Sequence, residues 1–482
     1  MATDRRGSVT PFNPTQRASA IRIQELKPSD DSLKNIHPVH LALAAALLGP
    51  ALVVAPSGSS KVASRAAAAE TRPNVLIIVT DDQRARSDTY EVMPRMRAWM
   101  KEGGTYFPNA VGTTPLCCPA RASIFTGRYV HNHKVETLTD PADLDQTTTM
   151  QYQLGQAGYR TGIVGKYLNG WRDDPPHFDT WSTLSHPAYV NPRMNIKGEE
   201  RVVQGYQTNI LRRRALAFLD YSEEMDQTPW LLYLTPFAPH APAVPDKKYA
   251  RAPVPPWIET PATTEEDVTD KHPYVQSSTT YTLRAARSGR TRMLRTLMTV
   301  DEMIGAVRKR LTSLGEKNTL VFFLTDNGYL WFEHNLSAKR HPYDGSVQIP
   351  FFVSWPGHVP PGIRDDRLVA NIDIAPTVYE ATGVTPSYEM DGRSLFSGES
   401  RDEILLEYFD DGRRVPSWSA LWAHDWEYIE FQDGFKEFYA PDDTWQLNNV
   451  LSTTTSLDDP PDLALIARRL ADARTCSGAD CP

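Results

Sequence analysis

The chain contains 482 residues, 40% of them hydrophobic, which is enough to bury a large core and predicts one large domain with a smaller appendage. Its 51 basic and 59 acidic residues give a net charge of −8, and no arginine-rich tract stands out, so we expect no nucleic-acid partner. The 38 prolines predict long, stiff surface loops, as in an enzyme that builds its site from loops on a rigid sheet.

Residues 1–70 differ in composition from the rest of the chain. Residues 40–55 are apolar but too few for a comfortable membrane span, and small residues follow them through the alanines at 66–69. We therefore expect a cleaved signal peptide, a secreted or extracytoplasmic protein and no stable membrane span; an uncleaved anchor helix is the alternative. Arg5-Arg6 is a twin-arginine candidate that lies far from the apolar run.

A strand buried on both faces is predicted at residues 74–80, where the run NVLIIVT precedes Asp81-Asp82. Further along, in the segment CCPAR, Pro119 suits the first turn of a helix. Cys117 and Cys118 are therefore expected at a helix N-terminus, which favours a thiolate or a bound oxyanion. A buried cysteine pair without chemistry is the alternative.

Two strands in the middle of the chain each lead to a basic side chain. Residues 160–164 precede Lys166, and residues 230–234 precede His240, whose flanking prolines restrict where its ring can point. Residues 241–290 show no clear period and predict a long loop region over the site. Helices are predicted over residues 90–102, 151–158, 209–219 and 292–314.

A further strand at residues 320–324 repeats the pattern of the first, because it leads into a threonine and then Asp326-Asn327. The carboxyl ends of parallel strands meet at one edge of a sheet, so we expect Asp81, Asp82, Asp326 and Asn327 to lie together. Such an oxygen-rich set favours Ca²⁺ or Mg²⁺ over Zn²⁺. Lys166, Lys339, Arg121 and His240 add cationic or donor groups, so the implied ligand is a tetrahedral oxyanion ester.

The character of the sequence changes after about residue 383. Short alternating strands are predicted at residues 404–409, 419–423, 426–431 and 436–439, followed by a helix at 462–474. The predicted fold is α/β, a large mixed, mostly parallel sheet sandwiched by helices over residues 71–383, with a smaller antiparallel sheet plus helix over 384–482. Cys476 and Cys481 either close a local disulfide or stay free thiols.

The cysteine segment resembles the signature of the sulfatase family, a formylglycine-dependent branch of the alkaline phosphatase-like superfamily. The signature is cysteine, any residue, proline, usually serine, and arginine, followed downstream by Thr-Gly-Arg; here it reads Cys117-Cys118-Pro119-Ala120-Arg121 and Thr126-Gly127-Arg128. The similarity extends over about residues 74–449 and includes Gly165-Lys166 and Asp326-Asn327-Gly328. Residues 115–135 and 165–169 look most like N-acetylglucosamine-6-sulfatases.

The resemblance implies a mechanism. Cys117 would be oxidised by a formylglycine-generating enzyme, and its hydrated aldehyde would attack sulfur with one hydroxyl and expel sulfate with the other. Asp81, Asp82, Asp326 and Asn327, with the modified Cys117, would bind Ca²⁺, with Mg²⁺ as the alternative. Lys166, Lys339 and His240 would hold the sulfate, His240 or Lys339 would protonate the departing alcohol, and Arg121 would support the formylglycine.

The sequence departs from the family pattern at two positions. Ala120 replaces the usual serine, and Leu168 stands where many sulfatases carry a histidine that acts as the base of the second step. Candidates for that base are Asn169, His131, His133 and His334, for each of which a packing or substrate-contact role is an equal alternative.

The leading hypothesis is an exported sulfuric ester hydrolase that acts on a sulfated sugar or an aryl sulfate. A phosphonate monoester or phosphodiester hydrolase is the nearest alternative, because relatives on this fold use the same modified cysteine. A non-catalytic binder of sulfated glycans is the third, if Cys117 stays unmodified.

Overall fold

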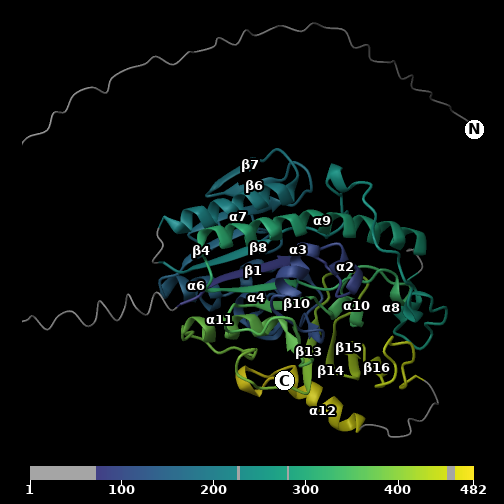
Figure 1. Ribbon diagram of the computed structural model, residues 1–482. Helices are drawn as coiled ribbons and strands as arrows, with labels where there is room; N and C mark the ends of the chain where they lie inside the picture. Colours follow the sequence, from purple (N-terminus) through teal and green to yellow (C-terminus); the bar gives the residue numbers. More distant parts are fainter. Residues whose placement is uncertain (1–71, 225–227, 279–281, 453–461) are drawn as a thin grey trace, which may run out of the picture. The chain divides into compact units, whose positions relative to one another are not determined.

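A ten-stranded mixed sheet lies at the centre of the fold (Figure 1). The computed structural model describes residues 72–224, 228–278, 282–452 and 462–482, so the predicted leader over residues 1–70, with its apolar run and Arg5-Arg6, lies outside the described residues. In spatial order the strands are β11 (Ile363–Arg364), β2 (Thr105–Tyr106), β10 (Phe351–Ser354), β9 (Thr319–Thr325), β1 (Asn74–Thr80), β8 (Trp230–Thr235), β4 (Arg160–Gly165), β5 (Thr180–His186), β6 (Arg193–Ile196) and β7 (Glu199–Val202).

The central strands β9, β1, β8, β4 and β5 run parallel, and β10 and β6 pair antiparallel on either side of them. Every residue of β1 is buried, as its unbroken apolar run predicts. The register places Val75 opposite Leu320 and Thr80 opposite Thr325. The residues that follow β1 and β9 therefore leave the sheet side by side.

Helices cover both faces of this sheet (Figure 1). On one face lie α3 (Pro94–Met96), α7 (Gln207–Glu223) and α9 (Leu283–Leu314), and on the other lie α4 (Cys117–Thr126), α6 (Met150–Gln156) and α11 (Ile374–Thr382). Side chains of β1 alternate between the two cores: Leu76 and Ile78 pack with the first group, and Val75 and Ile77 pack with the second. Both faces of the sheet are therefore covered, and a ligand can reach it at the ends of the strands.

A second, four-stranded antiparallel sheet follows in the chain. It consists of β13 (Glu403–Tyr408), β14 (Trp418–Ala423), β15 (Glu427–Phe431) and β16 (Lys436–Tyr439), and α12 (Leu463–Ala473) buries Ile466 and Leu470 in the same core. The predicted fold class is confirmed, and the domain boundary at residue 383 stays a prediction. The other short strands and α-helices are β3 (Ala110–Val111), β12 (Val369–Ala370), α2 (Ser87–Glu91), α5 (Val130–His133), α8 (Pro273–Gln276) and α10 (Asp344–Val347).

Two predicted elements differ from the structure. The helix predicted over residues 90–102 is wrong: α2 ends at Glu91, Pro94 begins α3, and a π-helical turn covers Arg97–Lys101. Proline lacks the N–H that would continue a helix but fits its first position, so the chain restarts there. The loop region over 241–290 is too long, because α9 already begins at Leu283, where the Thr282 side chain caps it.

Gly162 of β4 tests the packing of α7 on the sheet. A Cβ at this position would lie 2.3 Å from Cε2 of Phe218 in α7, so Gly162→Ala should destabilise the fold by about 1–3 kcal/mol. Gly155→Ala in α6 is the matched control, since its Cβ would come no closer than 4.0 Å to Thr161. It should be neutral or stabilising by about 0.5–1 kcal/mol. Equal thermal unfolding midpoints for the two variants would contradict this packing.

Candidate active site

The acidic residues predicted at two strand ends lie together. The backbone N–H of Asp82 donates to Asp326 Oδ1 at 3.2 Å, and Asn327 Nδ2 donates to Asp82 Oδ1 at 2.8 Å. Asp81, Asp82, Asp326 and Asn327 are all buried. Parallel pairing of β1 with β9 thus forms one enclosed cluster of oxygen ligands.

Cys117 approaches this cluster from the N-terminus of α4. The helix begins at Cys117 and ends at Thr126; Gly127 caps it, with a φ of 68°, the left-handed conformation that glycine favours. Ligand atoms of Cys117, Asp81 and Asp326 all lie within 4.8 Å of one another. Cys118 instead belongs to the apolar core beneath the sheet, where burial raises the pKa of its thiol to about 12. The two adjacent cysteines therefore occupy different environments.

Each carboxylate of the cluster pairs with its own buried cation. Lys166 Nζ lies 2.7 Å from Asp81 Oδ2, and Lys339 Nζ lies 2.5 Å from Asp82 Oδ1. Arg121 Nε lies 2.9 Å from Asp326 Oδ2. A buried charge is tolerated when it is paired and hydrogen-bonded, so the cations and carboxylates depend on one another.

The electrostatics keep these groups ionised. Burial opposes the charged form of Asp81 and Asp82, yet Lys166 and Lys339 respectively hold both carboxyl pKa values below their usual range. Burial likewise opposes the charge on Lys166 and Lys339, but the facing carboxylates raise both ammonium pKa values. The site therefore offers carboxylate ligands and cationic donors at neutral pH.

The donor set fits a hard divalent cation. Asp81 Oδ1 is buried and has no hydrogen-bond partner, although the other oxygen of the same carboxylate is paired. Ligand atoms of Asp81, Asp82 and His240 also lie within 4.8 Å of one another. Several carboxylate oxygens in one enclosed place, one of them without a donor, are what Ca²⁺ and Mg²⁺ prefer.

His240 lies at the rim of the cluster. Its Nε2 is 3.6 Å from Asp82 Oδ2, and its Nδ1 lies 2.6 Å from the carbonyl oxygen of Ala241. A carbonyl only accepts, so Nδ1 donates and Nε2 is the atom presented to the cluster. The His240 side chain is 29% exposed, whereas the lysines and the carboxylates that they pair with are at most 6% exposed.

Two further contributors were not predicted. Thr235 accepts from Arg121 Nη1 at 3.2 Å and donates to the carbonyl of Lys166, which ties both cations to the end of β8. The pattern of apolar run and threonine at strand ends could have identified it. Arg340, next to Lys339, forms a bidentate pair with Asp411, from Nε to Oδ1 at 3.0 Å and from Nη2 to Oδ2 at 2.6 Å. Asp411 lies 71 residues further along, and no sequence pattern connects the two.

The candidates for the second-step base make different contacts. His133 Nε2 lies 3.0 Å from Ser123 Oγ, its Nδ1 accepts from the backbone N–H of Val135, and burial lowers its pKa to about 3. His334 Nδ1 lies 2.6 Å from Glu265 Oε2. Asn169 has a buried Oδ1 without a hydrogen-bond partner. These contacts favour structural roles for the two histidines and leave the side chain of Asn169 available.

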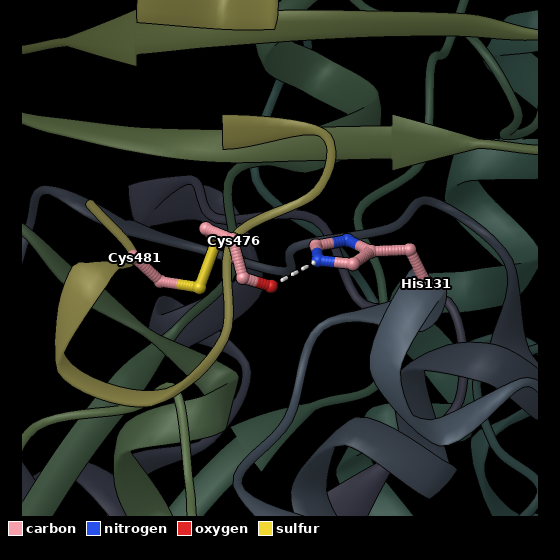
Figure 2. Close-up of side chains that lie close together, drawn as sticks. All are labelled: His131, Cys476 and Cys481. Carbon is pink, nitrogen blue, oxygen red and sulfur yellow. Dashed lines mark hydrogen bonds between the residues drawn. A yellow bond between two sulfur atoms is a disulfide. The ribbon is translucent and has the colours of Figure 1, made fainter. Parts of the chain in front are cut away.

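His131 anchors the C-terminal segment. Cys476 and Cys481 form a disulfide, and His131 Nε2 donates to the Cys476 carbonyl at 2.9 Å (Figure 2). Its Nδ1 lies 2.8 Å from Glu407 Oε1. Burial disfavours the protonated ring of His131, but the contacts that favour it, of which the hydrogen bond to Glu407 is the largest, together have the larger effect, so the pKa of His131 is raised. The imidazolium therefore holds the disulfide loop against the chain that follows α4.

Comparisons with known proteins find related sequences over most of the chain. A family model described as "Sulfatase" matches residues 73–384, and one described as "N-sulphoglucosamine sulphohydrolase, C-terminal" matches residues 332–458. The N-acetylglucosamine-6-sulfatase of Homo sapiens is 30% identical over 508 residues, which cover 90% of each chain. The extracellular sulfatase SULF-1 homolog of Drosophila melanogaster is 33% identical over 68% of this chain but only 31% of its own length. The match to a Caenorhabditis elegans homolog likewise covers 49% of that protein.

Solved structures share the fold. The structure of BT4656 in complex with its substrate D-glucosamine-2-N,6-O-disulfate matches with a TM-score of 0.71 at 21% identity, over 83% of this chain and 97% of that chain. The phosphonate monoester hydrolase of Agrobacterium radiobacter matches with a TM-score of 0.63 at 20% identity, over 80% of this chain and 92% of that chain. At these identities the likeness extends to the fold and no further.

The pH dependence of stability tests the His131 anchor. The pKa of His131 is raised in the folded state. Its contribution to the free energy of unfolding is therefore fully present below the ordinary histidine pKa of about 6.5 and is lost as pH rises through the folded pKa. His131→Asn should therefore cost about 1–3 kcal/mol near pH 5.5 and less near pH 8.5. The exposed His186 serves as the control, and His186→Asn should change little at either pH. Thermal unfolding of both variants at the two pH values measures these costs. A cost for His131→Asn that is larger at pH 8.5 than at pH 5.5 would contradict the assignment.

Proposed function

Because the chain belongs to the sulfatase family, whose members hydrolyse sulfuric esters, we propose that it hydrolyses the sulfate ester of a sulfated sugar, with N-acetylglucosamine-6-sulfate as the model substrate. The observation that carries the proposal is the approach of Cys117 within 4.8 Å of Asp81 and Asp326, in a cluster where each carboxylate has a paired cation. The name of the human relative, which matches over 90% of both chains, supports the sugar.

Two groups complete the site in this proposal. Asp81, Asp82, Asp326 and Asn327 would hold Ca²⁺, with Mg²⁺ as the alternative, and such an ion withdraws electron density from sulfate oxygens. Formylglycine, made from Cys117 by a formylglycine-generating enzyme, would supply a hydrated aldehyde as nucleophile in place of the thiol.

The chain's own residues bind the ester and move the proton. Lys166 and Lys339 would donate to the sulfate oxygens, since their ammonium groups lie beside the carboxylates of the cluster. Arg121 positions the start of α4, because its Nε holds Asp326 and its Nη1 donates to the Lys166 carbonyl at 3.0 Å. His240 would protonate the departing alcohol from Nε2, because it lies at the open rim through which an alcohol must leave.

We further propose that the protein is exported. The disulfide between Cys476 and Cys481 supports an oxidising compartment, and two relatives are named extracellular sulfatases. The predicted signal peptide within residues 1–70 would direct the export. Among the residues that the structure describes, no helix has the length and apolarity required to cross a membrane.

Paired cysteine variants test the proposed nucleophile. Cys117→Ala should reduce hydrolysis of N-acetylglucosamine-6-sulfate by at least about a thousandfold, because no other residue can supply the aldehyde. Cys118→Ala is the matched control: it should cost about 1–2 kcal/mol of stability and retain most turnover, since Cys118 lies in the apolar core. Mass spectrometry of the peptide that contains Cys117 should show CHO in place of CH2–SH.

Full turnover by Cys117→Ala would refute the proposed mechanism. A kcat/KM on nitrophenyl phosphonate esters far above that on nitrophenyl sulfate would instead favour the phosphonate monoester hydrolase alternative. A wholly thiol population without turnover would favour the glycan binder.

A leaving-group comparison tests His240. His240→Asn should lower kcat/KM on the sulfated sugar about a hundredfold and on nitrophenyl sulfate less than about tenfold, because nitrophenolate departs without a proton. Lys339→Met should lower both by similar factors, since a sulfate-binding group serves both substrates. Equal losses on the two substrates for His240→Asn would assign the histidine to binding.

Metal removal tests the oxygen cluster. A chelator should abolish turnover and lower the thermal unfolding midpoint, and Ca²⁺ should restore both, because an ion that binds only the folded state stabilises it. Asp81→Asn should respond to Ca²⁺ much less, since it loses the buried carboxylate whose Oδ1 has no partner. An unfolding midpoint of the chelated wild type that neither Ca²⁺ nor Mg²⁺ raises would contradict a metal at this cluster.

A further inference from the structure

A cavity of about 590 Å³ lies between the loop after β1 and the C-terminal sheet. Its walls include residues 84–86, the start of α10, the end of β14, the start of β15 and residues 443–446. None of its lining residues, in the part of the chain that the structure describes, is one of the proposed sulfate or metal ligands. A volume of this size is typical of pockets for small molecules.

A buried hydrogen-bond acceptor without a donor lies in this cavity wall. Glu427 is 3% exposed; its Oε2 accepts from Gln446 Nε2, but its Oε1 has no partner. The Gln446 Oε1 in turn accepts from the Asp344 N–H at 2.9 Å, and Trp422 Nε1 donates to Asp344 Oδ1 at 3.0 Å. The network therefore fixes both carboxylates and leaves Glu427 Oε1 without a donor, which is uncommon for a buried polar atom.

The charge of the lining selects the class of ligand. Its acidic residues outnumber its arginines, and Arg84 is already paired with Glu333 at 2.5 Å. Burial, reinforced by the neighbouring Asp344, raises the pKa of Glu427 well above its usual range. A bound cation would relieve that repulsion, whereas a sulfate or uronate group would add to it. The acidic lining residues are Glu333, Asp344, Asp425, Glu427 and Asp443.

Aromatic side chains form the rest of the wall. Trp445 is 37% exposed, and Arg86 lies over its ring at 5.6 Å. Trp422 and Trp426 also line the cavity. An exposed tryptophan beside buried carboxylates can pack against the C–H face of a sugar ring while the acids accept from its polar groups.

We propose that this cavity binds an amino sugar unit that carries a free ammonium group and no sulfate. The ammonium donates to Glu427 Oε1, and the pyranose ring packs against Trp445. This site would hold an unsulfated part of a glycan at a place other than the sulfate-binding cluster.

Calorimetric titration of the full chain tests the proposal, with saturating inorganic sulfate present to occupy the catalytic cluster. Glucosamine should bind, and N-acetylglucosamine should bind at least about tenfold more weakly, because its amide carries no charge. Glu427→Gln should weaken glucosamine binding about tenfold and leave N-acetylglucosamine unchanged, whereas Trp445→Ala should weaken both sugars about threefold. Glu399→Gln, an exposed residue outside the cavity, is the control.

The proposal is overturned if glucosamine binds Glu427→Gln as well as it binds wild type, or if wild type binds no glucosamine at millimolar concentration. It is also overturned if wild type binds glucosamine only when sulfate is left out. Displacement of glucosamine by Ca²⁺ would make the cavity a metal site and also overturn it. Glu427→Gln removes a buried negative charge whose Oε1 has no donor, so its unfolding midpoint should not fall. Neither sugar contains a sulfate ester, so this test can fail or succeed independently of sulfate hydrolysis.

Discussion

The proposed active site depends on the parallel pairing of β1 with β9. Because Thr80 lies opposite Thr325, the next residues of both strands leave the sheet at one edge and bring Asp81, Asp82 and Asp326 into one enclosed place. A shift of one residue in this register would turn the side chains of one of the two strands to the opposite face. The apolar runs that fill both cores thus also determine where the carboxylates lie.

Charge balance then determines whether that arrangement can be buried. The carboxylates of the cluster pair with Lys166, Lys339 and Arg121, which come from the position after β4, the loop after β9 and α4 respectively. Removing one partner would leave an uncompensated buried charge, so the cations have a structural role in addition to the one proposed for them. The cavity at Glu427 lacks this balance, because its acidic residues outnumber its arginines and Glu427 Oε1 has no donor; a cationic ligand would supply the missing charge.

The C-terminal segment contributes indirectly to the same site. His131 follows α4, the helix that begins at Cys117, and its imidazolium bonds both Glu407 of β13 and the disulfide loop at Cys476. Arg340, next to Lys339, pairs with Asp411 beyond the same strand. The small antiparallel sheet therefore supports two segments that carry proposed catalytic residues.

The sequence by itself determined the mostly parallel sheet, the strand ends that bear Asp81 and Asp326, and Cys117 at a helix start, since these follow from local apolar runs and from a specific motif. Pro94 broke a predicted helix, and Thr235 went unrecognised although it repeats a visible pattern. Only the tertiary structure decided which cation pairs with which carboxylate. It also decided that His131 binds the disulfide loop and that Asp344 and Glu427 line one cavity. Those contacts join residues far apart in the chain, and their geometry depends on packing that no local pattern encodes.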